Sequence, residues 1–234
     1  HFVNDNSHWL QVDKIGHGYS AYHLSCFATE SLQWSGVSDR QSVLYGAGAG
    51  FVFLSAIEVF DGYSAQWGAS AGDLAANATG TALFVSQELL WKEQRITPKY
   101  SFHSTEYASV RPEVLGSTYS EQMFKDYNGQ TYWLSVNLRS FAKNTKIPRW
   151  LNIAVGYGGE GMITGEDDLV NTVFLPTDRR YRQYYFSLDA DLTKIRTKSH
   201  VLKTIFSLVN TVKIPGPAIE LGKGQSARFH WIYF

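Results

Sequence analysis

The sequence is poor in cysteine and in charged residues. A single cysteine, Cys26, occurs in 234 residues, which excludes an internal disulfide and a cysteine-rich metal site. Charged residues make up 18% of the chain, against roughly 25% in an average soluble domain. Lys and Arg together number 21, as do Asp and Glu, so the formal net charge is zero. Because no positive field attracts phosphates, we expect no nucleic-acid partner.

Aromatic residues, in contrast, reach 15% of the chain. Few charges combined with many aromatic side chains indicate a surface that lies partly against apolar neighbours, and we expect membrane lipid and other proteins as partners. Residues 41–57, QSVLYGAGAGFVFLSAI, contain no charged residue. A bilayer span needs about 20 apolar residues. This stretch therefore fits a membrane-embedded helix and also a tightly packed helix of a soluble core.

Three segments have the length and apolar character of helices: residues 13–34, 40–66 and 70–91. The stretches SGVSD and WGAS separate them, and Ser38 and Ser70 are placed to cap the second and third helices. Gly46 and Gly50 lie one helical turn apart, a spacing that lets a neighbouring helix approach closely. We expect a glycine-rich, apolar three-helix bundle over residues 13–91, with a close helix contact at these two glycines.

The middle of the chain shows weaker patterns. Residues 92–131 contain Pro98, Pro112 and a DYNGQ turn signal, and we expect little regular structure there. The glycine-rich stretch 150–162 is expected to form either a helix of small residues or a close-packed loop. It is not a phosphate-binding loop, because no lysine and hydroxyl residue follow its glycines.

The C-terminal part alternates between strand and helix patterns. Residues 181–192 and 227–234 have strand patterns on either side of an amphipathic helix at 198–214, and the tail is expected to fold back through GKGQS. The whole sequence therefore predicts a mainly α fold. Residues 1–95 would form the helical bundle, and residues 96–234 an aromatic-rich region that packs on it, with a few strands and one amphipathic helix.

Each predicted helix carries two polar residues near one end. The pairs are Asp13 and His17 at the start of the first helix, Glu58 and Asp61 at the end of the second, and Asp73 and Asn77 at the start of the third. Side chains at these spacings project from one face of a helix. If consecutive helices run antiparallel, the three pairs lie at the same end of the bundle. We therefore expect these residues to form one structural polar cluster.

Acidic side chains on apolar helices need partners, because an unpaired buried charge is costly. Three arrangements would provide them: a divalent cation, a network of hydrogen-bonded or protonated carboxyls, or pairing with basic residues such as Lys14 and Arg40. A cation would be held by carboxylates and one imidazole, from Asp13, His17, Glu58 and Asp73. The same four residues would serve acid/base catalysis, with His17 as the base. We expect the structural network, with no metal and no other cofactor bound.

Two segments resemble a known family. The segments are DKIGH and, further along the chain, EVFDGYSAQWGASAGDLAANATG. In this order they resemble the YfiM-like predicted periplasmic lipoprotein family. The motifs of that family are an Asp-Lys-x-x-His helix, a Glu-x-x-Asp helix end and a Ser-x-x-Asp-x-x-x-Asn-x-x-Gly helix start. The segments also look like a relative of the VanZ-like helical module, where similar Asp/His, Glu and Asp/Asn positions recur on membrane helices. The resemblance covers residues 9–91, and YNGQTYWLSVN and WLNIAVGYGGEGM look like the longer envelope proteins of the family. It implies a periplasmic or outer-membrane location and no assigned activity.

These observations favour a non-enzymatic protein of the cell envelope. We expect it to be embedded in or seated on the outer membrane, or at its periplasmic face, as an accessory subunit of a larger assembly such as secretion or outer-membrane biogenesis machinery. The alternative is an enzyme that acts on a lipid or cell-wall substrate, with Asp13, His17, Glu58 and Asp73 around a metal or a water. No Gly-x-Ser-x-Gly elbow supports a serine hydrolase.

Overall fold

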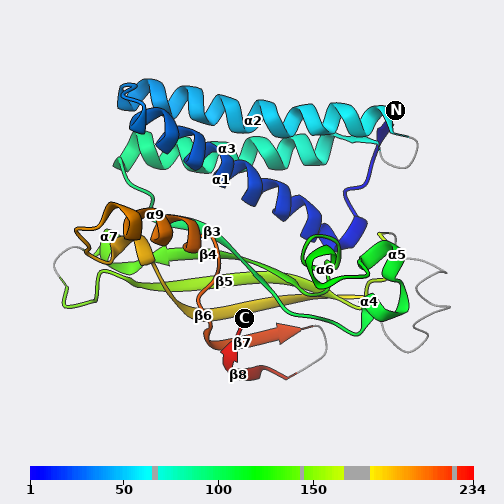
Figure 1. The fold of residues 1–234 in the computed structure, drawn as a ribbon. Helices are drawn as coiled ribbons and strands as arrows, with labels where there is room; N and C mark the ends of the chain where they lie inside the picture. Colours follow the sequence, from blue (N-terminus) through cyan, green and yellow to red (C-terminus); the bar gives the residue numbers. More distant parts are fainter. Residues whose placement is uncertain (65–67, 143–144, 166–179, 223–225) are drawn as a thin grey trace. The chain divides into compact units, whose positions relative to one another are not determined.

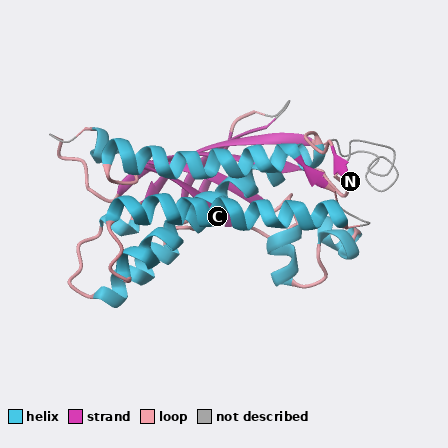
Figure 2. Cartoon of the chain, turned by 90° about the horizontal axis from the view of Figure 1, so that it is seen from above, coloured by secondary structure: helices cyan, strands magenta, loops and turns pink. Residues whose placement is uncertain are grey.

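The structure of the protein, a computed structural model, describes residues 1–64, 68–142, 145–165, 180–222 and 226–234. The chain forms two compact units. The helical unit comprises residues 1–7 and 13–94, and the sheet unit comprises residues 8–12 and 95–234 (Figure 1). Figure 2 distinguishes the helices from the strands by colour.

In the described part of the helical unit, three long helices are present where the sequence predicts them: α1 (Val12–Trp34), α2 (Asp39–Tyr63) and α3 (Ala71–Trp91). A short strand, β1 (Phe2–Val3), pairs in parallel with β2 (Ala69–Ser70), directly before α3. This pairing brings the N-terminal arm to the start of α3. The buried apolar core between the helices is formed by Tyr22, Val43, Ala47 and Phe84.

Glycines set the spacing of these helices. A Cβ atom at Gly46 would lie 2.5 Å from the backbone nitrogen of Thr29, and one at Gly50 would lie 2.8 Å from that of Ser25, both on α1. Such distances leave no room for a side chain, because real Cβ atoms do not approach backbone so closely. Gly46 and Gly50 thus lie at the closest approach of α2 to α1.

Within its described residues, the sheet unit forms a six-stranded antiparallel sheet whose strands follow chain order. The strands are β3 (Ile96–Phe102), β4 (Gln130–Asn137), β5 (Leu151–Glu160), β6 (Tyr181–Ala190), β7 (Gly216–Gly222) and β8 (Arg228–Tyr233). The short helices are η1 (His8–Gln11), α4 (Tyr107–Val110), α5 (Pro112–Leu115), α6 (Tyr119–Lys125), α7 (Leu138–Phe141), η2 (Leu192–Lys194) and α9 (His200–Val209).

The predicted mainly α fold is therefore wrong, and the protein has a mixed α and β structure. Strand β3 lies inside residues 92–131, where we expected irregular structure, and β5 occupies the glycine-rich stretch where we expected a helix or loop. A Cβ at Gly156 on β5 would lie 2.7 Å from the ring of Trp133, its partner on β4. The glycine makes room for an indole on the neighbouring strand, a reason that local sequence does not reveal.

The C-terminal strands agree better with the sequence patterns. Strands β6 and β8 lie where strand patterns were found, and α9 lies inside the predicted amphipathic helix. Strands β7 and β8 are antiparallel, so the tail folds back as predicted. Residues 223–225, at the expected turn, lie outside the described residues.

On the strands of the sheet, several polar side chains are buried and several apolar side chains are exposed, which is the reverse of the usual distribution. On β6, Gln183, Ser187 and Asp189 are buried, whereas the alternate residues Phe186 and Leu188 are about half exposed. An antiparallel sheet with one face in water normally buries its apolar side chains.

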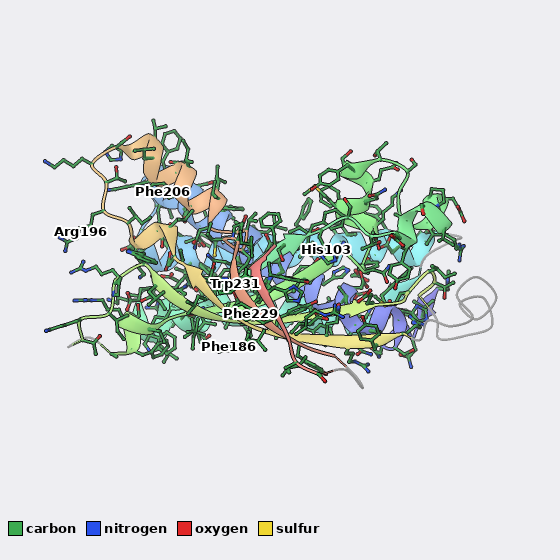
Figure 3. The ribbon with its side chains drawn as sticks, turned by 90° about the horizontal axis from the view of Figure 1, so that it is seen from below. His103, Phe186, Arg196, Phe206, Phe229 and Trp231 are labelled. Carbon is green, nitrogen blue, oxygen red and sulfur yellow. The ribbon has the colours of Figure 1, made fainter. Side chains whose placement is uncertain are left out.

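Cross-strand partners on the exposed face line up from β4 to β8. They form a continuous series, which we call the apolar row, of Leu134, Val155, Phe186, Ile219 and Phe229. Each of these side chains is exposed between 42% and 53%. Phe186 and Phe229 are labelled in Figure 3, together with Trp231, which is 80% exposed. The outer face of the sheet is therefore apolar.

The opposite face encloses a polar and aromatic interior. The hydroxyl of Tyr233 on β8 lies 3.2 Å from Oγ1 of Thr131 on β4, and the Tyr233 ring is 5.9 Å from that of Trp133. Strands β5, β6 and β7 separate β4 from β8 in the sheet order. The sheet therefore curls until β8 faces β4 across this interior.

Two buried lysines share one carboxylate in the interior. Lys99 Nζ lies 2.9 Å from Oδ2 of Asp189, Lys213 Nζ lies 3.9 Å from Oδ1, and none of the three side chains is exposed. The Lys213 ammonium also donates to the carbonyls of Leu188 and Ile214 at 2.8 and 2.7 Å. Burial lowers the pKa of Lys213 from 10.5 to about 8. The Asp189 carboxylate offsets this shift only partly, and the positive charge of Lys99 lowers the pKa further.

Replacement of Gly46 tests the helix contact. Gly46→Ala is expected to lower the free energy of unfolding by about 1–3 kcal/mol, because the added methyl forces α1 and α2 apart. Gly48→Ala is the matched control, since a Cβ at Gly48 has no neighbour within 4 Å. This control should raise stability by up to about 1 kcal/mol, through helix propensity alone. Urea titration of both variants measures the difference, and equal effects would contradict the close packing.

The Lys213 pKa predicts an alkaline rise in stability. Between pH 8 and 10.5 the unfolded chain holds a proton on Lys213 that the native state has released, so the free energy of unfolding increases with pH. A shift of this size corresponds to roughly 3 kcal/mol over the window. Lys213→Met should flatten this part of the urea-denaturation profile, while Lys198→Met, which removes an exposed lysine, should not. Parallel profiles for wild type and Lys213→Met would refute the assignment.

Candidate functional site

The candidate site lies at one end of the helical unit. It combines the start of α1, the end of α2 and the start of α3, the ends on which the sequence places its polar pairs. Asp73, Asn77 and Glu58 are buried, whereas Asp13 and His17 are half-buried. We call these residues, together with Lys14, Asp5 and Ser70, the polar cluster.

Lys14 occupies the centre of the charges. Its Nζ lies 2.7 Å from Oδ2 of Asp5, 2.8 Å from Oδ1 of Asp73 and 3.2 Å from Oδ2 of Asp13. These three carboxylates come from the N-terminal arm, from α3 and from α1. An ammonium group has three protons to donate, so one side chain joins all three segments.

His17 lies between the other two helices. Its Nδ1 is 3.2 Å from Oδ1 of Asn77 and 3.7 Å from Oε1 of Glu58, and its Nε2 is 3.7 Å from Oδ1 of Asp73. The hydrogen bond is the one to Asn77, because 3.7 Å is too long for the carboxylates. An amide oxygen only accepts, so Nδ1 carries the proton in this arrangement. His17 therefore links α1 to α3 and lies in the field of two carboxylates.

Ser70 fixes the start of α3, as the sequence predicts. Its Oγ accepts hydrogen bonds from the backbone N–H groups of Gly72 and Asp73 at 3.1 and 3.2 Å and donates to Oδ1 of Asp5 at 2.5 Å. Its own N–H donates to Oε2 of Glu58 at 3.3 Å. The helix cap thereby connects the N-terminal arm and the end of α2 to the polar cluster.

Two residues considered from the sequence, Asp61 and Arg40, do not belong to the polar cluster. Asp61 lies one turn beyond Glu58, where its charge contributes to raising the pKa of Glu58. Among the described residues it makes no bond to the other predicted members. Arg40, which we considered as a basic partner, is exposed at the start of α2. Lys14 fills that role instead.

Burial and ion pairing act in opposite directions on these groups. Burial raises the pKa of Asp73 above its usual range, although Lys14 and His17 oppose the shift, and burial likewise raises the pKa of Glu58. Burial disfavours the Lys14 ammonium, but its bonds to Asp5 and Asp73 outweigh this effect and raise its pKa from 10.5 to about 12. The stabilisation from Lys14 is therefore complete below pH 10.5 and lost only as the pH rises through about 12.

A metal centre fits these residues poorly. Asp13, His17 and Asp73 each offer one ligand atom, and these atoms lie within 4.8 Å of one another. Carboxylates with one imidazole suit several divalent cations. The Lys14 ammonium, however, already supplies the positive charge among the same carboxylates, and a second cation there would be repelled by it. The geometry fits an ion cluster centred on a lysine.

Within the described parts of the chain, one donor in the polar cluster has no hydrogen-bond partner. The Nδ2 group of Asn77 is buried and has no hydrogen bond among the described residues. Asp5 was missed in the sequence, because it joins the polar cluster only through the pairing of β1 with β2. No spacing rule connects an N-terminal arm to a helix start more than sixty residues later.

Removal of Lys14 tests the structural role of the polar cluster. Lys14→Met is expected to lower the free energy of unfolding at neutral pH by roughly 3–5 kcal/mol, because it leaves the buried carboxylate of Asp73 without its cation. The loss should shrink as the pH falls and Asp73 takes up a proton. Urea titrations across this pH range provide the measurement.

Two further variants control this experiment. Arg40→Met removes an exposed cation near the other end of α2 and should change stability by less than about 0.5 kcal/mol. Adding Asp73→Asn to Lys14→Met should restore part of the loss, since it removes the unpaired charge. A Lys14→Met protein as stable as wild type would show that the ion cluster does not hold the helices.

Residues 2–88 match the model of a family described as predicted periplasmic lipoprotein (DUF2279). The matched range holds all members of the polar cluster. No curated protein and no solved structure matches the chain. The narrower resemblances, to YfiM-like proteins and to the VanZ-like module, stay predictions. The match supports a periplasmic lipoprotein family for the helical unit, and with it a place in the cell envelope.

Proposed function

We propose that the protein is a non-enzymatic envelope protein that is seated on the outer membrane and serves as an accessory subunit of a larger assembly. The observation that carries this proposal is the outer face of the sheet, which exposes the apolar row, while buried polar and aromatic side chains occupy the enclosed face. Sheets whose outer face meets lipid alternate in this way. In water, monomeric proteins rarely expose an apolar patch larger than a few hundred Å².

Helix α2 supports the same conclusion. Within the described ranges it is the helix that is long and apolar enough, by length and composition, to cross a membrane. Only 33% of its most apolar stretch is buried, which is unlike the core helix of a soluble protein. The exposed apolar residues of α2 include Leu44, Tyr45, Val52, Phe53 and Phe60.

The sheet favours a seat on the membrane surface over full embedding. Among the described residues, strand β8 pairs only with β7, so it forms an edge of the sheet. Hydrocarbon offers no hydrogen bonds to such an edge. The apolar row is therefore proposed to contact lipid while the edge of β8 stays in water or against another protein.

The enzymatic alternative has less support. His17 lies near two buried carboxylates of raised pKa, Glu58 and Asp73, which is a feature of acid/base sites. Yet Nδ1 of His17 is bonded to Asn77, and Lys14 neutralises Asp73. These side chains bind one another across the three helices, and we propose a structural role for them.

A single charge in the apolar row should weaken membrane binding. Phe186→Glu is expected to reduce binding to lipid vesicles roughly tenfold or more, because burial of one phenylalanine alone contributes about 1.5–3 kcal/mol. Phe124→Glu is the matched control, since Phe124 is an exposed aromatic residue on α6, outside the row. Co-sedimentation with vesicles made from outer-membrane lipids provides the measurement.

Two results would end the proposal. One is a wild-type protein that binds no vesicle. The other is a native protein that migrates as a detergent-free monomer when envelope membranes are extracted and sized. Co-migration with other envelope proteins in mild detergent is the result expected for an accessory subunit.

A further inference from the structure

The pairing of β8 with β7 is interrupted by a β-bulge. On one side of the interruption Tyr233 pairs with Gly216, and on the other side His230 pairs with Ala218. Two residues of β8 therefore lie opposite the single residue of β7 between these pairs. An extra residue in one strand of an antiparallel pair is the defining feature of a bulge.

The two bulge residues are Trp231 and Ile232, and the residue opposite them is Pro217. Proline has no backbone N–H and cannot donate to a neighbouring strand. Within sheets it is therefore confined to edges, strand starts and bulges. The position of Pro217 accounts for a bulge at this point of β8.

The bulge changes the direction in which the side chains of β8 point. Phe229 lies on the outer face and His230 points inward, where its Nε2 lies 2.8 Å from Oε2 of Glu220. Strict alternation would then place Tyr233 outside. Tyr233 instead points inward, with its hydroxyl 3.2 Å from Oγ1 of Thr131. The extra residue absorbs the difference, so two consecutive side chains are left on the outer side.

These two side chains, which we call the bulge pair, are the most exposed apolar ones on the six described strands. Trp231 is 80% exposed and Ile232 is 76% exposed, against 42–53% for the members of the apolar row. The Trp231 ring packs edge-on against that of Phe229, with the ring centroids 5.0 Å apart (Figure 3). The bulge pair therefore continues the apolar row at the edge of the sheet and projects beyond it.

We propose that the bulge pair anchors the sheet in a lipid bilayer, with Trp231 and Ile232 inserted between the lipid headgroups. The apolar row then lies on the membrane surface beside the anchor. This inference rests on the proposed membrane seat and names the two side chains that hold it.

Three observations favour a bilayer over a protein as the partner of the bulge pair. A bulge disrupts the regular ladder of an edge, which disfavours the addition of a strand from a second copy or from another protein. The pair projects from the sheet, so a protein partner would need a pocket of matching shape, whereas fluid lipid takes up any projecting apolar group. Tryptophan is also enriched where a protein crosses the boundary between water and hydrocarbon.

Quenching by brominated lipid tests where Trp231 lies. The chain contains seven tryptophans, so the signal of Trp231 is the difference in emission between wild type and Trp231→Phe. This variant keeps an aromatic ring and should still bind vesicles. On phosphatidylcholine vesicles brominated near the headgroup, the difference signal is expected to be quenched. A vesicle-bound protein whose Trp231 emission is unquenched would overturn the inference.

Serine variants test how much the bulge pair contributes to binding. Trp231→Ser and Ile232→Ser are each expected to weaken vesicle binding roughly tenfold or more, because each removes an apolar side chain that leaves water on insertion. Phe124→Ser is the matched control, since Phe124 on α6 is 77% exposed, and it should bind as wild type does. Equal losses in all three variants would refute a specific anchor. Thermal melting checks that each variant is folded.

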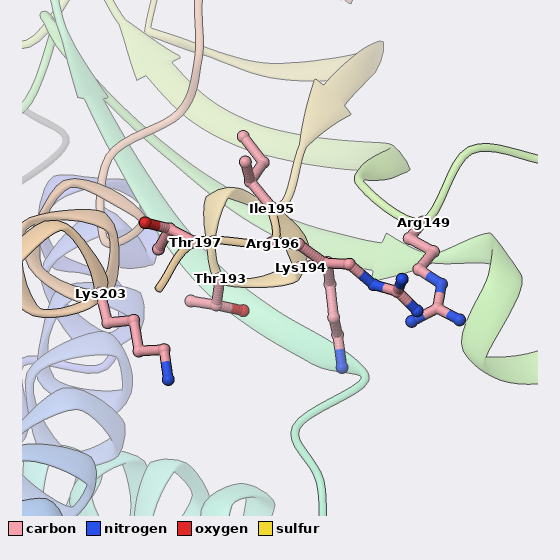
Figure 4. Close-up of a pocket in the computed structure, with 7 residues that line it drawn as sticks. All are labelled: Arg149, Thr193, Lys194, Ile195, Arg196, Thr197 and Lys203. Atoms are coloured by element: carbon pink, nitrogen blue, oxygen red, sulfur yellow. The ribbon is translucent and has the colours of Figure 1, made fainter. Parts of the chain in front are cut away.

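The choice of lipid keeps charge out of this test. A pocket of about 400 Å³ in the sheet unit has four basic residues in its lining (Figure 4): Arg149, Lys194, Arg196 and Lys203. Basic side chains are attracted to any anionic membrane surface. Phosphatidylcholine carries no net charge, so binding to it reports apolar contacts. The losses in the serine variants should therefore be the same at low and high salt, and losses that vanish at high salt would contradict the inference.

The outcomes separate this inference from the proposed function. If wild type binds no vesicle, the membrane seat itself is wrong. If Phe186→Glu weakens binding while both serine variants bind as wild type does, the seat stands and the anchor is wrong. If the serine variants keep vesicle binding but lose co-migration with an envelope protein, or change from dimer to monomer, the bulge pair binds protein and the inference is overturned.

Discussion

A buried charge needs an opposite charge or several hydrogen bonds, and this requirement shapes the interior of both units. In the helical unit, the Lys14 ammonium holds together carboxylates from the N-terminal arm, α1 and α3. In the sheet unit, Asp189 stands between Lys99 and Lys213. Each ion cluster joins segments that are far apart in the sequence. Polar contacts thus act together with the small apolar cores of the two units in specifying the tertiary structure.

The polar interiors leave apolar side chains on the outside. The apolar row of the sheet, the apolar residues of α2 and those of α9 are all accessible. Since the hydrophobic effect is roughly proportional to the apolar area removed from water, these surfaces contribute little to folding in water and much to association with lipid or protein. The proposed membrane seat therefore rests on the exposed apolar surfaces, which remain available for association after the chain has folded.

The polar cluster contains the residue types of an acid/base site, but its contacts are internal. His17 bonds Asn77, Ser70 bonds Asp5, and Glu58 accepts from the backbone at the start of α3. Side chains that bond one another in this way hold the helices in position. These bonds explain why α1, α2 and α3 meet at their polar ends although the apolar core between them is small.

The sequence by itself determined the local features. Apolar length and the breaks between segments located α1, α2 and α3, and Ser70 was recognisable as a cap. The i, i+3 and i, i+4 spacings picked out three polar pairs, and the structure brings Asn77, Glu58 and Asp73 from them near His17. Tertiary structure decided the rest. Asp5 reaches Lys14 only through the pairing of β1 with β2. The glycine-rich stretch forms β5 between β4 and β6, where Gly156 leaves room for Trp133 on the neighbouring strand. The placement of apolar side chains on the exposed face of the sheet also depends on strand pairing. Strict alternation shows that a strand has two different faces, but which face is enclosed depends on how the sheet curls and which ions meet inside it.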